Sequence, residues 1–274
     1  MIDLHLHTTA SDGRCTPAEL VERAARAGLT VMAVTDHDTT AAVDEVAAAS
    51  RVRGIEVIAG IEITAVENGR DVHVLGYFVN PADAQLSGFL ARQRAQRIER
   101  VTAVGDRLSR LGMPIDLAPL LALAKAEEGR SIGRPQIARA MIAAGYVADS
   151  NEAFDRWLAA GRPAYVPRAG AAPEEVIAIV HAAGGLVSLA HPGQTAVDAR
   201  ISEYARGGLD ALEVFHPDHD AASTKRYREL ASSLKLLVTG GSDFHGDPSH
   251  GWEPGAVTLP ADAWRRLRDA ALHA

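Results

Sequence analysis

The stretch Ile2-Asp3-Leu4-His5-Leu6-His7 decides how the rest of the chain is interpreted. Apolar and polar residues alternate along it, which is typical of a half-buried β-strand. His5 and His7 are two positions apart, so both side chains lie on the same face of this strand. Asp12 follows in the next loop, close enough to fold back toward the strand end. Two imidazoles and a carboxylate at one strand end predict a metal site.

The composition is typical of a soluble globular protein. The chain has 274 residues, of which 47% are hydrophobic, enough for one large domain or a domain with an insertion. No apolar run approaches the roughly 20 residues of a membrane helix, and no signal region precedes the first strand. We therefore expect a cytoplasmic protein without a membrane partner. The single Cys15 excludes an internal disulfide and is expected to be a small residue before a helix cap.

The charge of the chain is unevenly distributed. The net charge is −7, but the segment from Arg92 to Arg168 has 13 Lys/Arg and 8 Asp/Glu, a balance of +5. The remainder has 15 Lys/Arg and 27 Asp/Glu, a balance of −12. A basic middle in an acidic chain indicates an anionic substrate. Solvated arginines on amphipathic helices explain the same asymmetry equally well.

Apolar runs alternate with helical segments over most of the chain. One such helix is predicted from a Thr16 cap, with Pro17 and Glu19 in its first turn, to a stop at Gly28. Repeated βα units predict a parallel sheet, either closed into a barrel or open and doubly wound. Nearly every run ends in, or contains, a His, Asp or Glu, and a barrel would gather these ends into one ring. The barrel is therefore the favoured fold. The predicted strands cover residues 31–35, 56–63, 72–77, 186–190, 211–215 and 236–239.

The pattern changes in the middle of the chain, where no strand-like runs occur. A long Arg-rich helix is predicted from Gln93 to Leu111, followed by several short helices. We therefore predict a small helical domain at residues 91–165, inserted into the barrel as a substrate cap. Residues 1–90 and 166–274 would form the barrel.

Nine residues are candidate metal ligands. Nine are too many for one ion and suit two or three divalent ions with open positions for water. Nitrogen and oxygen donors without a thiolate fit Mn, the first expectation, and also Fe or Zn. Glu62 stands in an otherwise apolar strand, where an unpaired carboxylate would be costly, whereas His73 is the weakest candidate taken alone. The nine are His5, His7, Asp12, His37, Glu62, His73, His191, Asp243 and His245.

Several separate motifs resemble, in their order along the chain, those of the PHP (polymerase and histidinol phosphatase) family. The resemblance extends from the first strand to Trp252 and is interrupted by the inserted segment. It implies an α/β fold, a distorted (β/α)7 TIM-like barrel with a trinuclear metal centre. The motifs are His5-Leu6-His7, Thr35-Asp36-His37, Glu62, His73, Ala190-His191-Pro192 and Ser242-Asp243-Phe244-His245.

The same resemblance implies how the ligands are shared among the ions, with Glu62 bridging. No ligand of the family's set is missing, so an active enzyme is expected. One metal would be held by His5, His7, Glu62 and Asp243, a second by Asp12, His37 and His245, and a third by Glu62, His73 and His191.

The inserted segment narrows the choice among possible substrates. The stretch Arg130-Ser131-Ile132-Gly133-Arg134-Pro135 places two arginines before a helix N-terminus, which is typical of a phosphate site. An ordinary loop before a first-turn proline explains it too. An insertion with Gly-Arg-Pro resembles the stand-alone bacterial PHP members that act on 3′,5′-nucleoside bisphosphates, and some relatives also trim RNA from the 5′ end. The candidate substrate-binding residues are Arg134, Ser131, Asp12, His216, Arg97 and Arg100.

We therefore expect a metal-dependent phosphatase that removes the 3′-phosphate of adenosine 3′,5′-bisphosphate and gives AMP. The candidate catalytic residues are His191, His37 and Asp243, although a metal-bound imidazole does not easily also act as a general acid. Three alternatives stay open: a 5′–3′ exonuclease on short RNA or DNA, another small-molecule phosphatase such as a histidinol phosphatase, and a non-catalytic metal-stabilised module. The net charge of −7 argues against tight binding of long polyanions. The expected partner is a small nucleotide, and no protein partner is inferred.

Overall fold

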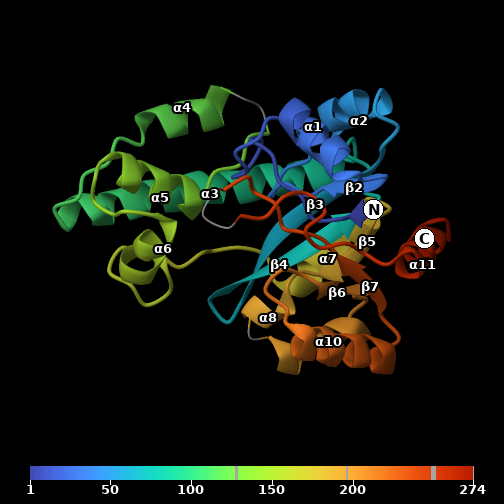
Figure 1. Ribbon diagram of the computed structural model, residues 1–274. Helices are drawn as coiled ribbons and strands as arrows, with labels where there is room; N and C mark the ends of the chain where they lie inside the picture. Colours follow the sequence, from blue (N-terminus) through green and yellow to red (C-terminus); the bar gives the residue numbers. More distant parts are fainter. Residues whose placement is uncertain (127–128, 196, 248–250, 274) are drawn as a thin grey trace.

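Seven strands form one nearly closed, barrel-like sheet in the order in which they occur along the chain (Figure 1). The computed structural model describes residues 1–126, 129–195, 197–247 and 251–273. Beyond the first strand, Leu6 pairs in parallel with Phe244, which brings the two ends of the sheet together. The strands are β1 (Ile2–Asp3), β2 (Val31–Val34), β3 (Glu56–Glu67), β4 (Arg70–Tyr77), β5 (Leu186–Leu189), β6 (Ala211–Phe215) and β7 (Leu237–Gly240).

Helices cover the outside of this sheet and form a lobe on one side of it (Figure 1). The helices around the sheet are α1 (Pro17–Ala27), α2 (Val43–Arg51), α7 (Pro173–Ala182), α8 (Pro192–Thr195), α9 (Ile201–Arg206), α10 (Ala221–Leu234) and α11 (Ala261–Ala271). The lobe, called the cap below, contains the outer part of α3 (Ala84–Arg110), α4 (Ala118–Ala126), α5 (Arg134–Ala143), α6 (Ser150–Ala153) and a π-helical turn at Phe154–Leu158.

The first helix forms for the reasons that its sequence indicates. The Thr16 side chain accepts a hydrogen bond from the backbone N–H of Glu19, and the Glu19 carboxylate accepts one from the backbone N–H of Thr16. This capping box satisfies N–H groups that have no partner inside the helix. Gly28 ends the helix with φ 77°, a conformation that glycine adopts without steric cost. The predicted bounds of this helix are confirmed.

The sheet differs from a purely parallel barrel at β4. This strand is antiparallel to both β3 and β5, whereas the other neighbouring strands are parallel. Asn68 and Gly69 connect β3 to β4 with φ values of 49° and 75°. Two central residues with positive φ match the right-handed twist of a hairpin, and Asn-Gly is the pair best suited to them. The expectation of an all-parallel sheet was wrong at this point because it overlooked this turn.

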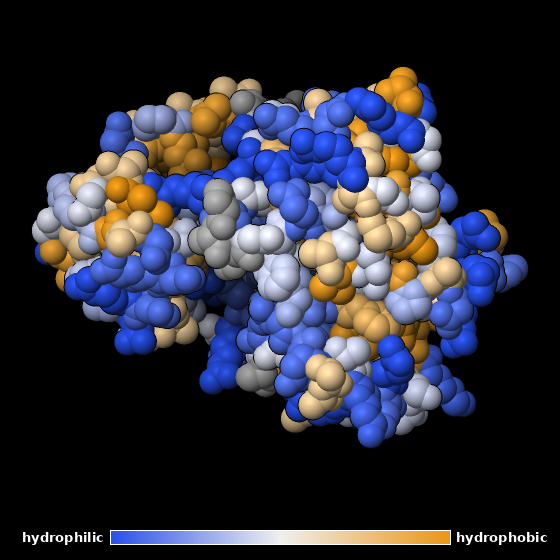
Figure 2. All heavy atoms as spheres, viewed as in Figure 1, coloured by the Kyte–Doolittle hydropathy of each residue, from blue (hydrophilic) through white to orange (hydrophobic). Residues whose placement is uncertain are grey.

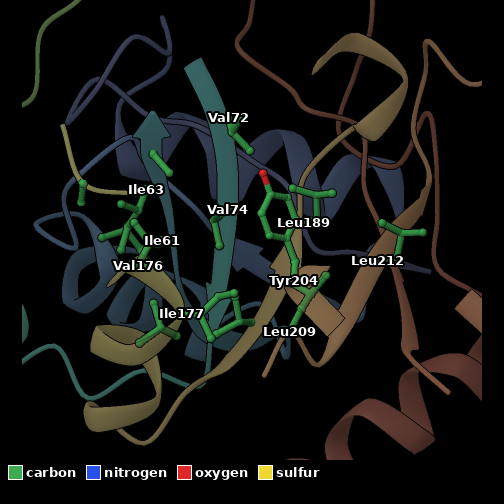
Figure 3. Close-up of a cluster of buried hydrophobic side chains, with 14 of the residues drawn as sticks. Ile61, Ile63, Val72, Val74, Val176, Ile177, Leu189, Tyr204, Leu209 and Leu212 are labelled. Atoms are coloured by element: carbon green, nitrogen blue, oxygen red, sulfur yellow. The ribbon is translucent and has the colours of Figure 1, made fainter. Parts of the chain in front are cut away.

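A large core cluster lies between the sheet and the helices. Figure 3 shows side chains of β3 and β4, such as Ile61 and Val74, gathered with Val176 and Ile177 of α7. All four are buried. A second cluster, which includes Leu4, Leu75 and Tyr77, is completed by Trp264 and Leu267 of α11. Side chains therefore fill the interior of the barrel, and polar residues that could bind a ligand are confined to one end of it.

The cap has a core of its own but shares one helix with the barrel. The first turns of α3 place Leu86 and Phe89 in the barrel core, and its later turns place Val104 and Leu108 in the cap core. This helix begins at Ala84, capped by Asp83, and not at Gln93 as expected, because the side chain of Asp83 accepts the N–H of Leu86. The division into residues 91–165 and the remainder stays a prediction.

Among the described residues, no helix is long and apolar enough to cross a membrane.

Truncating Ile177 tests the core. We expect Ile177→Ala to lower the free energy of unfolding by about 2–5 kcal/mol, because the side chain is buried and its removal leaves a cavity. The measurement is urea unfolding followed by circular dichroism. Val52→Ala is the control, since Val52 is 85% exposed. Equal losses for the two variants would contradict the assigned packing.

Candidate metal centre

The nine candidate ligands lie together at one end of the barrel. The ring centroids of His7 and His245 are 4.0 Å apart, those of His37 and His73 are 4.9 Å apart, and those of His73 and His191 are 5.2 Å apart. Parallel strands bring their C-terminal ends to one edge, which is where most of these residues stand. Because β4 runs the other way, its fourth residue, His73, reaches this edge.

The first group of ligands surrounds one point between two carboxylates. The Nε2 atoms of His5 and His7 lie 3.4 and 3.3 Å from Glu62 Oε2. The same two nitrogens lie 3.2 and 3.3 Å from Asp243 Oδ1. Two imidazoles and two carboxylate oxygens that converge in this way could serve as the protein ligands of one divalent ion.

The second group surrounds Asp12. His245 Nε2 lies 3.1 Å from Asp12 Oδ1, and His37 Nε2 lies 3.5 Å from Asp12 Oδ2. His7 Nδ1 is 3.8 Å from Asp12 Oδ1, so His7 stands between the first and the second group. The structure thus brings together the three residues expected to share an ion and adds His7 to their surroundings.

The third group surrounds the other oxygen of Glu62. His73 Nδ1 and His191 Nε2 lie 2.8 and 3.1 Å from Glu62 Oε1. His37 Nδ1 lies 3.0 Å from Glu62 Oε2. With histidines around both of its oxygens, Glu62 could contribute to more than one ion site.

The donor atoms of this cluster fit metal ions. Five buried imidazole nitrogens have no hydrogen-bond partner among the described residues: His5 Nε2, His7 Nδ1 and Nε2, His37 Nδ1 and His191 Nδ1. A buried polar atom without a partner costs about 1–3 kcal/mol. A metal ion would accept the lone pair of one nitrogen in each of these four rings and remove that part of the cost.

Glu62 and His7 have the protonation states that metal binding requires. Burial raises the pKa of Glu62, but the neighbouring His37, His73 and His5 outweigh burial and hold it well below its usual range. Burial, together with the charge on His245, lowers the pKa of His7 to about 3. An ionised carboxylate and a neutral imidazole are the forms that bind metals.

A second layer of carboxylates holds the ligands in place, and Glu213 is the clearest case. This residue of β6 is completely buried. Its Oε1 lies 2.9 Å from His5 Nδ1, and its Oε2 accepts the backbone N–H of His191 at 2.7 Å. A carboxylate on the far nitrogen of a histidine fixes its tautomer and turns Nε2 toward the metal.

Two more buried carboxylates hold the ligand-bearing loops. Asp36 accepts hydrogen bonds from Thr8 and Ser11, and so fixes the loop between His7 and Asp12. Asp3 accepts the N–H and the hydroxyl of Ser242, and so holds the loop that contains Asp243. The sequence interpretation missed these roles and that of Glu213. An acidic residue inside an apolar run, the signal used for Glu62, also marks Glu213 and Asp3.

The metal loop packs too tightly to admit a side chain at Gly13. A Cβ atom there would lie 2.7 Å from the carbonyl carbon and oxygen of His7. Glycine therefore allows the loop to fold back onto the strand end and deliver Asp12.

Four arginines and Asp71 line a cavity of about 240 Å³ together with several of the candidate ligands, and this cavity is called the arginine pocket below. Asp71 Oδ2 lies 3.2 Å from Arg100 Nη1 and 2.9 Å from Arg134 Nη2, and Asp71 Oδ1 lies 3.5 Å from Arg168 Nε. Arg97 pairs with Asp38. Burial, followed by the charge of Arg97, lowers the pKa of Arg168 to about 9. Asp71 and Arg168 were not among the residues expected from the sequence.

The remaining candidates for substrate binding differ in whether their side chains line a cavity and are free to contact a substrate. Arg97 is 6% exposed and donates to Asp38 and Thr64, so its guanidinium is largely occupied. Ser131 is buried and lines neither this cavity nor the larger one beside it; its N–H donates to Ala10 O at 2.8 Å. His216 lines the larger cavity, with Nε2 3.3 Å from Asp243 Oδ2.

Comparisons with known proteins agree with this geometry. The PHP domain model matches residues 3–156. The chain is 35% identical over 252 residues to a 5′-3′ exoribonuclease of Haemophilus influenzae, covering 89% of each. It is 31% identical over 275 residues to a 3′,5′-nucleoside bisphosphate phosphatase of Chromobacterium violaceum, covering 97% of this chain and 96% of the relative. A solved structure from Bifidobacterium adolescentis, described as a metal-dependent phosphoesterase, has a TM-score of 0.88 at 38% identity, covering 97% and 94%.

A barrel with nine histidines and carboxylates clustered at one end, together with relatives named for the hydrolysis of phosphoesters, defines a metal-dependent phosphoesterase. The chain belongs to the PHP domain family. The family expected from the sequence motifs is thereby confirmed, as is the distorted barrel.

Replacing Glu213 tests the second layer. We expect Glu213→Gln to weaken metal affinity by about 10- to 100-fold, because the neutral amide no longer orients His5 as a charged acceptor does. The measurement is competition with a chromophoric chelator, together with the metal content of the purified protein. Glu45→Gln on the exposed face of α2 is the control. Unchanged affinity in Glu213→Gln would contradict the role assigned to it.

Metal binding should depend on pH. Burial lowers the pKa of His245, but Asp12 and Asp243 outweigh burial and raise it to about 10. Below that pH the ring holds a proton that a metal ion must displace, so we expect apparent affinity to rise with pH. Calorimetric titration in buffers of different ionisation enthalpy would measure the released protons. Affinity that is constant between pH 6 and 9, without proton release, would contradict this coupling.

Proposed function

We propose that this protein removes the 3′-phosphate from 3′,5′-nucleoside bisphosphates, such as adenosine 3′,5′-bisphosphate, and gives AMP and phosphate. The observation that carries the proposal is the arginine pocket beside the metal centre. Arg100, Arg134 and Arg168 line the same cavity as Glu62 and His191. A substrate with one phosphate at the metals therefore has a place for a second phosphate next to it.

The charge of the pocket suits a phosphate monoester. Apart from the candidate metal ligands, the salt bridges here join four guanidinium groups to two carboxylates, Asp71 in the cavity and Asp38 behind it, which leaves a surplus of two positive charges in this network. A phosphate monoester carries about −1.5 to −2 at neutral pH. Arg100 Nη2 and Arg168 Nε are buried without a hydrogen bond among the described residues, and phosphate oxygens would satisfy both.

The roles of the individual arginines follow from their contacts. Asp71 holds Arg100, Arg134 and Arg168 at one place while leaving part of each guanidinium for a ligand. Arg97 is held by Asp38 and braces the pocket from behind. We assign the second phosphate to Arg134, Arg100 and Arg168, and a bracing role to Ser131, which anchors the cap to the metal loop.

The metal centre would hold two or three divalent ions, with Mn as the first expectation and Fe or Zn as alternatives. We assign His5, His7, Glu62 and Asp243 to one ion, Asp12, His37 and His245 to a second, and Glu62, His73 and His191 to a third. Bound ions would neutralise the phosphoryl oxygens and lower the pKa of a bound water.

Other residues of the chain orient the groups that would act on the phosphate. Glu213 and Asp36 keep the ligands oriented, and His216 donates from Nε2 toward Asp243, since its Nδ1 accepts the backbone N–H of Asp218. We assign His191, His37 and Asp243 catalytic roles as ligands and give no side chain the role of general acid. The cytoplasmic location also stays a prediction.

Exonuclease activity on short oligonucleotides remains the second candidate, because a relative of comparable identity is named an exoribonuclease. The same arginine pocket would bind a terminal 5′-phosphate. Both activities break the bond between phosphorus and a ribose 3′-oxygen, so the metal centre does not distinguish them.

A substrate panel and one arginine variant test the proposed function. We expect the Mn-loaded protein to release phosphate from adenosine 3′,5′-bisphosphate and to leave AMP intact. Arg134→Gln should raise KM for the bisphosphate about tenfold, because a charge-assisted hydrogen bond contributes about 1.5–3 kcal/mol. Hydrolysis of p-nitrophenyl phosphate, which has no second phosphate, should change little.

The control is Arg110→Gln, which removes an exposed charge at the end of α3. Protein that leaves the bisphosphate intact while hydrolysing AMP or histidinol phosphate would refute the proposed substrate. Equal effects of Arg134→Gln on the bisphosphate and on p-nitrophenyl phosphate would refute the role of the pocket.

A further inference from the structure

The cap contacts the metal loop through three consecutive backbone oxygens. Helix α5 stands between the arginine pocket, which Arg134 lines, and the larger cavity, which Arg139 lines. This helix and the residues just before it donate one hydrogen bond to each of three successive carbonyl groups of the loop that delivers Asp12. The pairs are Ser131 N–H to Ala10 O at 2.8 Å, Gln136 Nε2 to Ser11 O at 2.7 Å and Arg139 Nη1 to Asp12 O at 3.0 Å.

Gln136 also holds the turn that precedes α5. Its Oε1 accepts the backbone N–H of Gly133 at 2.9 Å, while its Nε2 donates to Ser11 O. The side chain is half-buried, and both polar atoms of its amide are used. A single side chain therefore connects the start of α5 to the metal loop.

The turn held by Gln136 determines where Arg134 lies. Arg134 is the first residue of α5 and directly follows Gly133. Its Nη2 lies 2.9 Å from Asp71 Oδ2 in the arginine pocket. A Cβ atom at Gly133 would lie 3.0 Å from Arg97 Nη1, so the turn packs directly against the back of this pocket. A shift of the turn would therefore move Arg134 within the pocket.

The metal loop has a separate anchor in the barrel. Asp36 accepts hydrogen bonds from the hydroxyl groups of Thr8 and Ser11 and from the N–H of Thr8. Because this anchor does not involve α5, the loop would keep its place without Gln136. What Gln136 adds is the position of Arg134 relative to Asp12.

We propose that Gln136 is a positioning residue that sets the separation between the arginine pocket and the metal centre, and so favours substrates with two phosphates. The inference rests on the proposed function, in which Arg134 binds one phosphate while the metal centre takes the other. The ribose keeps the two phosphates within a limited range of separations, so both sites must be held at a matching distance. A misplacement of about 1 Å can lower a rate by about 100-fold.

A positioning role predicts a change in kcat. Without the hydrogen bond to Ser11, the arginine pocket still binds the second phosphate, but the first is less often placed at the metals. We therefore expect kcat for the bisphosphate to fall about tenfold while KM changes little. Arg134→Gln removes a binding contact and is expected to raise KM instead.

Two variants of Gln136 and one matched control test this role. Gln136→Glu keeps an oxygen for the N–H of Gly133 but loses the donor to Ser11 O, and Gln136→Met loses both contacts without adding a charge. Either should lower kcat for adenosine 3′,5′-bisphosphate about tenfold and leave kcat for p-nitrophenyl phosphate nearly unchanged. The control is Gln96→Glu, which adds the same charge on α3; Gln96 is half-buried and has no hydrogen bond among the described residues.

A double-mutant cycle with Arg134→Gln adds a readout that a merely structural role would not change. If Gln136 acts through Arg134, Gln136→Met should lower kcat much less in the Arg134→Gln protein than in the wild type. Metal content and thermal unfolding of each variant show whether the metal loop is intact.

Equal losses of kcat on the two substrates, additive effects in the cycle, a higher KM with unchanged kcat, or a loss of bound metal would each overturn the inference and leave the proposed function intact. Wild-type protein that leaves the bisphosphate intact would refute the proposed function, and the inference with it.

Discussion

The buried carboxylate of Glu62 is the constraint around which this molecule is arranged. It is 1% exposed, and five histidines lie within 3.4 Å of its two oxygens. A carboxylate removed from water is tolerated only when cations or donors compensate it. Strands β1 to β5 must therefore end or pass at the same level to supply those histidines. Backbone strain accompanies this requirement: His191 and Asp243 have positive φ values of 22° and 49°. Strained conformations of non-glycine residues cost about 1–3 kcal/mol each and tend to occur at functional sites.

The clustering of the candidate ligands could be predicted from the sequence, because the relevant signals are local. His5 and His7 share a face through the two-residue period of a strand, and His37 and His191 each follow an apolar run. The residues that support the ligands were harder to find. His5 and Glu213 are 208 positions apart, and no periodicity connects them. Their contact exists only because β1 and β6 face the same interior of a closed sheet.

The residues of the arginine pocket could likewise be predicted from the sequence only in part. Arg134 stood out because it precedes a first-turn proline, but Asp71 and Arg168 had no local motif. Asp71 stands in the β3–β4 hairpin, and Arg168 follows the cap, so only the folded chain brings them to Arg134. The hairpin itself was signalled by Asn68-Gly69. An Asn-Gly pair between two strands predicts a hairpin, and therefore an antiparallel β4 and the direction from which His73 enters the site.

The cap and the metal centre are one physical unit, although their cores are separate. Arg139 and Gln136 of α5 donate to the backbone oxygens of Asp12 and Ser11, and Ser131 donates to Ala10. The loop that delivers a candidate ligand is thus held by the helix that separates the two cavities. Relatives named phosphatase and exoribonuclease share this family, and the bond broken is the same in both reactions. Because Pro135 of α5 lines both cavities and Arg139 of α5 holds the backbone of Asp12, the position of the cap is coupled to that of a candidate ligand.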